Sequence, residues 1–177
     1  MRKMRLVIII ALMLSVVACT SKREKYLEEI RQVEQQVFDT TKIPTAKEME
    51  MLAEMYLEYA KEFPEDTISP LFMLRSAELF KLSGKPAKGF ALLDSIYVKY
   101  PDSRWAPAAL LTAAIWYDQE ARDIARARQK LLTIIEKYPD SEFADDAQKM
   151  LDLLDKSPEE ILEMLEGESK PIQGSGS

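Results

Sequence analysis

Apolar residues recur along this chain at the spacing of helices, and the two-residue alternation of strands is nowhere sustained. Residues 71–82 and 108–117 are almost continuously apolar, as expected of helices that pack on more than one side. Residues 86–100 and 123–138 keep their apolar residues on one face, as surface helices do. The pattern therefore predicts an all-α fold.

Start and turn signals divide these helices into pairs. Pro86 suits a first helical turn, and Asp123 suits the N-cap of the later surface helix. Gly84 supplies the turn in one pair, and Arg122 takes the corresponding place in the other. Each pair is predicted to form an antiparallel hairpin.

A repeat organises the chain, because three short blocks align when their prolines are superposed. The blocks are Phe63-Pro64-Glu65-Asp66, Tyr100-Pro101-Asp102-Ser103 and Tyr138-Pro139-Asp140-Ser141. Their prolines are 37 and then 38 residues apart. Four residues after each proline comes a large apolar side chain: Ile68, Trp105 or Phe143. A period in this range is typical of stacked helical hairpins.

The repeats resemble the tetratricopeptide family. Its first helix pairs a small residue with an aromatic three positions later, as Ala77 with Phe80 and Ala114 with Tyr117 do here. The family positions of the second helices hold Gly89, Leu93, Ile96 and Pro101 in one repeat, and Ala127, Leu131, Ile134 and Pro139 in the next. The first repeat, ending at Pro64, matches less well, with Leu52, Tyr56 and Tyr59. The resemblance implies antiparallel hairpins stacked as a short right-handed solenoid.

The N-terminal segment has the order of parts found in a secretory signal. Three basic residues come first: Arg2, Lys3 and Arg5. An apolar stretch over residues 6–17 follows, broken only by Ser15, and it is short of the roughly 20 residues of a membrane-spanning helix. The run Val16-Val17-Ala18-Cys19 resembles a bacterial lipobox and contains the single cysteine of the chain. This resemblance implies a lipoprotein signal peptide over residues 1–18 and lipidation of Cys19; a plain secretory peptide and an uncleaved anchor are the alternatives.

Together, the lipobox and the long repeats resemble the periplasmic lipoprotein branch of the tetratricopeptide family. That branch includes the repeat lipoprotein of the outer-membrane β-barrel assembly machinery and the coordinator of the Tol-Pal envelope system. The resemblance implies a lipid-anchored outer-membrane protein that faces the periplasm, with protein partners in outer-membrane or envelope assembly. Thr20 fits outer-membrane sorting, because an aspartate at that place marks inner-membrane retention in enteric bacteria.

Composition argues against several other functions. Histidine is absent, which removes the commonest general base, the usual catalytic triad and most zinc sites. Three of the five glycines fall in the last eleven residues, so no glycine-rich phosphate loop is present. The formal charge of -6 would become about -9 without residues 1–18, a balance that repels nucleic acid. We expect no cofactor, metal, nucleic acid or small-molecule substrate, and a non-catalytic adaptor; an enzyme that uses the repeats as a scaffold is the rival.

In tetratricopeptide arrays the first helix of each hairpin lines a concave groove. The family positions place a candidate partner groove at Leu74, Glu78, Lys81, Leu111, Ile115 and Asp118. Such a mixed apolar and charged surface suits an extended or helical segment of another protein. Ordinary packing against neighbouring helices is the other interpretation of its apolar members.

Residues 19–45 are predicted to hold the lipidated N-terminus, a helix over residues 21–39 and then a loop. Four apolar residues share one face of that helix: Tyr26, Ile30, Val33 and Val37. This face predicts packing on the array as the first half of the weak first hairpin. A coiled-coil stalk is the alternative.

The repeat domain is predicted to span residues 46–166. Residues 144–154 form its last first-type helix, and the run Ser157-Pro158-Glu159-Glu160 gives a capped start to a short helix reaching Leu165. That short helix would cover the apolar end of the solenoid or bind a partner. Residues 167–177 are predicted to be a disordered tail.

Overall fold

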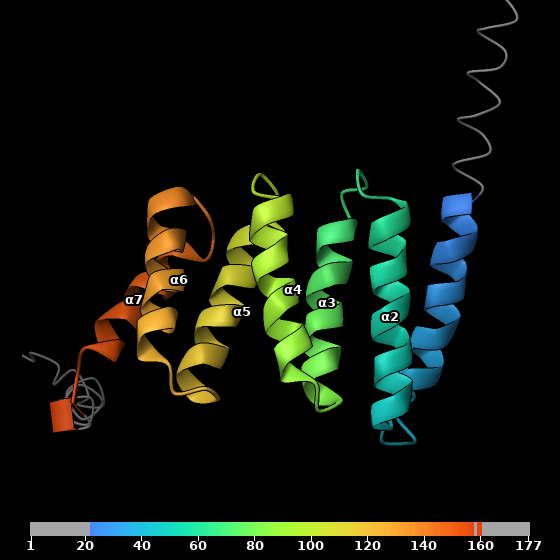
Figure 1. Ribbon diagram of the computed structural model, residues 1–177, viewed down its shortest axis with the longest axis horizontal. Coiled ribbons are helices and arrows are strands. Elements are labelled where there is room, and N and C mark those ends of the chain that lie inside the picture. Colours follow the sequence, from blue (N-terminus) through green and yellow to red (C-terminus); the bar gives the residue numbers. More distant parts are fainter. Residues whose placement is uncertain (1–21, 158, 161–177) are drawn as a thin grey trace, which may run out of the picture. The chain divides into compact units, whose positions relative to one another are not determined.

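The computed structural model describes residues 22–157 and 159–160. The regular secondary structure of these residues is entirely helical (Figure 1). A first helix covers residues 22–37 and is called helix 22–37 below. The others are α2 (Ala46–Glu62), α3 (Ser69–Leu82), α4 (Pro86–Lys99), α5 (Trp105–Gln119), α6 (Ile124–Lys137) and α7 (Ala144–Leu154). These bounds agree with the predicted segments to within a few residues, and the all-α prediction is confirmed.

The described residues divide into two compact units, one that ends at Trp105 and one that begins at Ala106. Within the first, α2 packs against α3 and α3 against α4; within the second, α6 packs against α7. In these three pairs, sequence neighbours are also packing neighbours, as in a hairpin array.

The helix start signals work as their chemistry suggests. The Thr45 hydroxyl accepts from the Glu48 amide, and the Glu48 carboxylate accepts from the Thr45 amide, which forms a capping box at the start of α2. Pro86 occupies the first turn of α4, as predicted. The Asp123 side chain caps α6 by accepting from the Arg126 amide at 3.0 Å, also as predicted.

The two hairpin turns share a backbone conformation. Gly84 has φ 85° and Arg122 has φ 53°, so both lie in the left-handed region. The predicted correspondence between these two positions is confirmed. Glycine adopts this conformation without cost, whereas an arginine there is strained.

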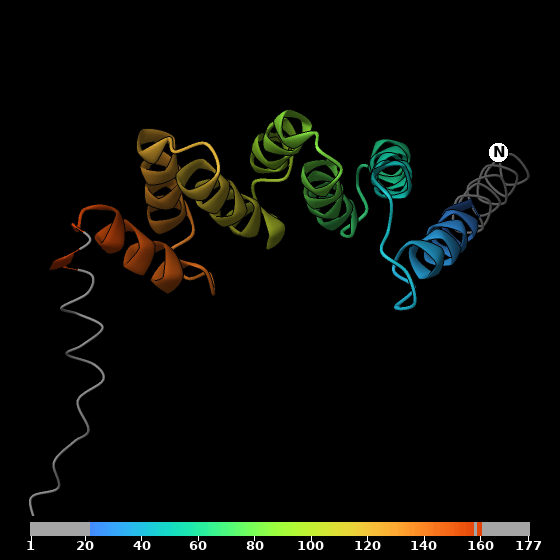
Figure 2. The same ribbon diagram turned by 90° about the horizontal axis from the view of Figure 1, so that it is seen from below.

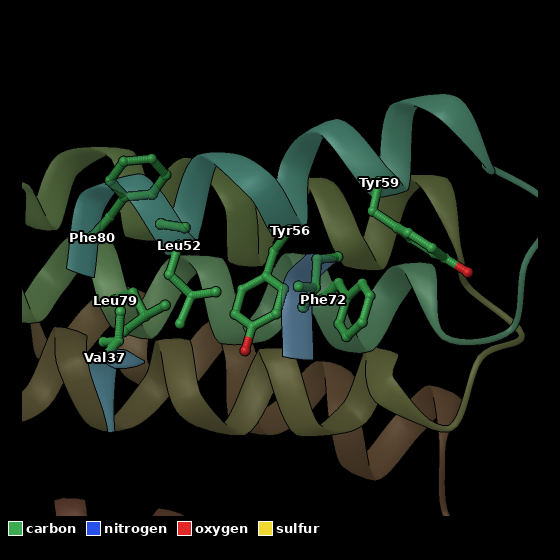
Figure 3. Packing of buried hydrophobic residues seen from close by; sticks show 9 residues of the cluster. Val37, Leu52, Tyr56, Tyr59, Phe72, Leu79 and Phe80 are labelled. Atoms are coloured by element: carbon green, nitrogen blue, oxygen red, sulfur yellow. The ribbon is translucent and has the colours of Figure 1, made fainter. Parts of the chain in front are cut away.

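Helix 22–37 packs on the repeats, and its apolar face closes the core of the first unit. Ile30 and Val37 are each 1% exposed, and they cluster with Leu52, Tyr56 and Phe72. Figure 3 shows Val37, Leu52, Tyr56 and Phe72 together, and Figure 2 shows helix 22–37 and α3 flanking α2. The packing expectation is confirmed, so this face is not free to form a coiled-coil stalk.

Polar contacts also join helix 22–37 to α2 and to the loop that follows α2. Tyr26 donates a hydrogen bond to Glu58 at 3.0 Å, and its ring lies edge-on to Tyr59 with centroids 5.9 Å apart. Near the other end, the Tyr56 hydroxyl donates to Glu34 at 2.6 Å. Two ion pairs join Lys22 to Glu62 and Arg23 to Asp66. The helix is thus held along its length.

The family positions within the helices of both well-matched repeats are buried, whereas the terminal prolines Pro101 and Pro139 are exposed. The buried positions are Ala77, Phe80, Gly89, Leu93 and Ile96 in the first unit, and Ala114, Tyr117, Ala127, Leu131 and Ile134 in the second. Small side chains at helix crossings let the paired helices approach, and the large ones fill the space between them.

At the C-terminal end, the predicted capped start is present. The Ser157 hydroxyl accepts from the Glu160 amide at 3.2 Å, and the Glu160 carboxylate accepts from the Ser157 amide at 2.7 Å. The rest of the predicted short helix, residues 161–165, lies outside the described residues, as does the tail over residues 167–177. Of the helices in the described part, none is both long and apolar enough to cross a membrane.

Candidate partner-binding groove

A groove of about 560 Å³ lies in the first unit, between helix 22–37 and α3, with α2 at its base. Its lining comprises Glu34, Gln35, Phe38, Tyr56, Arg75, Glu78, Leu79 and Leu82. This volume is within the range of ligand sites in proteins. Helix 22–37 and α3 are successive first helices of hairpins, so the groove lies where the tetratricopeptide pattern expects a concave surface.

The groove contains Glu78 but neither of the other residues predicted on α3. Leu74 is 8% exposed and packs inside the unit, and Lys81 is half-buried beside the lining. The lining uses Arg75 and Leu82, each one residue later than a predicted position. One residue turns a helical side chain by about 100°, so the lining face of α3 is rotated relative to the family-based choice.

The three predicted residues of the second unit are on α5. Leu111, Ile115 and Asp118 are all half-buried. Because they belong to the other unit, a single groove joining all six predicted residues stays a prediction.

Large apolar side chains are left uncovered at the groove. Phe38 is 54% exposed and Leu82 is 66% exposed, while Leu79 and Tyr56 are buried beneath them. Exposed apolar residues gathered at a hollow are typical of interaction sites. Sequence reasoning missed Phe38, although its place directly after Val37 sets it off the buried face of the helix.

The groove carries two carboxylates and one guanidinium. Arg75 lies 3.3 Å from Glu34, and the Tyr56 hydroxyl donates to the same carboxylate oxygen. Burial, followed by the hydrogen bond to Glu34, raises the pKa of Tyr56 above its usual range, so this hydroxyl keeps its proton. The Glu34 carboxylate therefore has both a hydrogen-bond donor and a cation within its own unit.

Glu78 has a different environment from Glu34. Its side chain reaches solvent, yet burial of the carboxyl raises its pKa, and the nearby Arg75 only partly opposes that effect. No hydrogen bond or ion pair to Glu78 is found among the described residues. The groove therefore has a net negative charge and an under-compensated carboxylate.

Two further hollows of about 640 and 510 Å³ meet at the hairpin junctions of the first unit and share Pro64, Glu65, Lys99 and Tyr100. Two of their charged side chains make internal contacts. Asp66 binds Arg23, Tyr59 and the Ile68 amide, and Arg104 lies over the Trp105 ring.

Two large side chains of the second unit have structural roles. Trp116 is buried. Arg126 on α6 pairs with Asp123 at 3.2 Å and lies over the Tyr117 ring. Within the described residues, no group of three potential ligands could hold a metal ion.

A model of the tetratricopeptide repeat family matches residues 108–141, which cover most of α5 and all of α6. The comparisons with curated proteins and with solved structures found no match. The family match and the helical hairpins confirm the predicted tetratricopeptide-like, all-α solenoid class; its handedness stays a prediction. Such repeats mediate protein–protein interactions and are generally non-enzymatic scaffolds.

Proposed function

We propose that this protein is a lipid-anchored adaptor on the periplasmic side of the outer membrane, where it binds proteins of an outer-membrane or envelope assembly. The observation that carries the binding role is the open apolar groove between two first helices of tetratricopeptide-like hairpins. The lipobox-like run ending at Cys19 supports the location.

The anchor would act over a short distance. Residue 22, the first described residue, follows Cys19 by three positions, and three residues of chain can reach about 11 Å at most. Because helix 22–37 is packed on α2, acyl chains on Cys19 would keep the whole first unit near the bilayer surface. The anchor therefore serves to concentrate the groove where envelope proteins assemble.

The closest alternative is a Tol-Pal-type coordination protein, which has the same anchor and a different partner. A structural stalk is less well supported, because Ile30 and Val37 are already buried within their own unit. An enzyme built on the scaffold is also less well supported, since Glu34 is committed to Tyr56 and Arg75.

Fatty-acid labelling tests the anchor. Cells that express the full chain are fed a radioactive fatty acid, and label is expected in the wild type and absent in Cys19→Ser. Ser21→Ala is the matched control and should label normally. Label that persists in Cys19→Ser would contradict the anchor.

Affinity capture tests the adaptor role. The native lipoprotein is isolated from intact envelopes, and its companions are identified by mass spectrometry. Components of the β-barrel assembly machinery support the first assignment, and Tol-Pal components support the alternative. Recovery of neither contradicts both assignments.

A further inference from the structure

We propose that the groove between helix 22–37 and α3 receives a segment of a partner protein that carries a lysine or arginine between apolar residues, with Glu78 accepting the cation. This inference rests on the proposed adaptor function and specifies the chemistry of the partner. Tetratricopeptide membership alone does not select a basic partner; the charges within this groove do.

The need for a cation comes from the surroundings of Glu78. The Glu78 side chain is exposed in the groove lining, and no hydrogen bond or ion pair to it is found among the described residues, so its carboxylate is open to a cation. An incoming ammonium or guanidinium group would supply a charge-assisted hydrogen bond. Arg75 does not do so, because its guanidinium is directed to Glu34 at 3.3 Å.

The apolar requirement comes from Phe38 and Leu82. Their exposed surfaces flank the groove, and covering them removes apolar area from water. Leu82 follows Glu78 by four residues, so the two side chains lie one turn apart on the same face of α3. A matching partner segment places its cation and an apolar side chain a similar distance apart.

Charge argues against the chain itself as the occupant. Residues 159–168 hold apolar residues but also five glutamates and no basic residue, so this segment would meet the acidic groove with like charge. A second copy, with a formal charge of -6, has the same disadvantage. A basic segment from another protein is complementary.

A displayed library of random peptides provides the probe. The full chain in detergent is used for selection, and Leu82→Asp is used for counter-selection. Enriched peptides are expected to carry lysine or arginine with apolar residues within four positions on either side. The Kd of the best synthetic peptide should rise about ten- to hundred-fold in Glu78→Gln, the range for loss of a charge-assisted hydrogen bond.

Matched variants separate the groove from general charge and general apolarity. Glu136→Gln removes a carboxylate from the exposed surface of α6, and Val98→Asp alters a side chain that is 74% exposed on α4. Both variants should bind the peptide as the wild type does. Helical circular dichroism checks that every variant is folded.

Several results would overturn the inference. Groove-dependent peptides that lack basic residues, or equal affinity in Glu78→Gln and Glu136→Gln, would contradict the cation while leaving the adaptor role intact. A Leu82-dependent dimer in sedimentation, or tighter peptide binding after deletion of residues 159–177, would identify a second copy or the C-terminal segment as occupant. Capture of envelope proteins at equal yield by Leu82→Asp would place their binding outside this groove.

Discussion

Asp66 shows how a single residue adapts a repeat junction to an extra helix. Its Oδ1 accepts from the Ile68 amide at 3.1 Å, as Ser103 accepts from the Trp105 amide at 3.2 Å in the next repeat. The second oxygen of Asp66 accepts from Tyr59 and from Arg23 of helix 22–37. A serine can cap the loop, but only a carboxylate has an oxygen left for both donors.

Asp66→Ser should therefore keep the loop cap and lose the ties to Tyr59 and Arg23. We expect a loss of about 1–3 kcal/mol in the free energy of unfolding, since the hydroxyl of the buried Tyr59 is left unpaired and the ion pair with Arg23 is lost. Burial raises the pKa of Asp66, but the hydrogen bonds from Arg23 and Tyr59 outweigh it and lower the pKa overall.

The stabilisation from Asp66 should accordingly be fully present at pH values above the usual pKa of an aspartate. It should be lost as the pH falls through the lowered pKa of Asp66 in the folded protein. Chemical denaturation over a pH series measures this. The difference between wild type and Asp66→Ser should shrink in acid, whereas Asp102→Ser, at an exposed position, should differ little from wild type at any pH. A stability difference between wild type and Asp66→Ser that does not change with pH would contradict a contribution from the ionised Asp66 carboxylate.

Glu78 should have the opposite dependence on pH. Its pKa is raised by burial, so the folded state holds the proton more tightly than the unfolded state and the charge is destabilising at neutral pH. Glu78→Gln should increase stability by about 0.5 kcal/mol or less at neutral pH, because an exposed side chain is well screened. The gain should disappear once the pH falls below the usual glutamate range. A loss of stability at neutral pH would show that Glu78 has a favourable partner.

At the scale of elements, the hairpin turns offer a matched pair of substitutions. Gly84→Ala places a side chain at φ 85°, where a Cβ would meet nothing within 4 Å, so any loss reflects backbone conformation alone. We expect it to destabilise by about 1 kcal/mol. Arg122→Gly relieves the strain at φ 53° and should be neutral or stabilising by up to about 1 kcal/mol. Thermal unfolding measures both, and effects of the same sign would contradict the shared turn conformation.

The sequence predicted these elements well because each was marked by more than one local signal. The proline blocks, the start residues Pro86 and Asp123, and the helical spacing of apolar residues all agree with α4 and α6. Helix 22–37 was harder to assign, because its apolar stripe fits both packing and a stalk. Only its contacts with Tyr59 and Phe72 distinguish them.

The groove was less predictable than the helices. Family positions on α3 identified Glu78, yet the lining face is turned by one residue, a rotation set by how α3 packs on α2 and α4. Phe38 comes from a helix outside the well-matched repeats. Tertiary packing decides both points, and neither is encoded in the local pattern.

At the scale of the whole molecule, the two compact units predict that a core defect in one will spare the other. Ile30→Ala tests this, because Ile30 is 1% exposed and joins helix 22–37 to the core of the first unit. Such a truncation costs about 2–5 kcal/mol. Hydrogen exchange read by mass spectrometry should show faster exchange in α2 and α3 and little change in α6 and α7. Ile124→Ala, at a residue 40% exposed, is the control with a small expected effect. An equal rise in exchange across both units would mean that they unfold as one, and a defect in helix 22–37 would then weaken the entire adaptor rather than its groove alone.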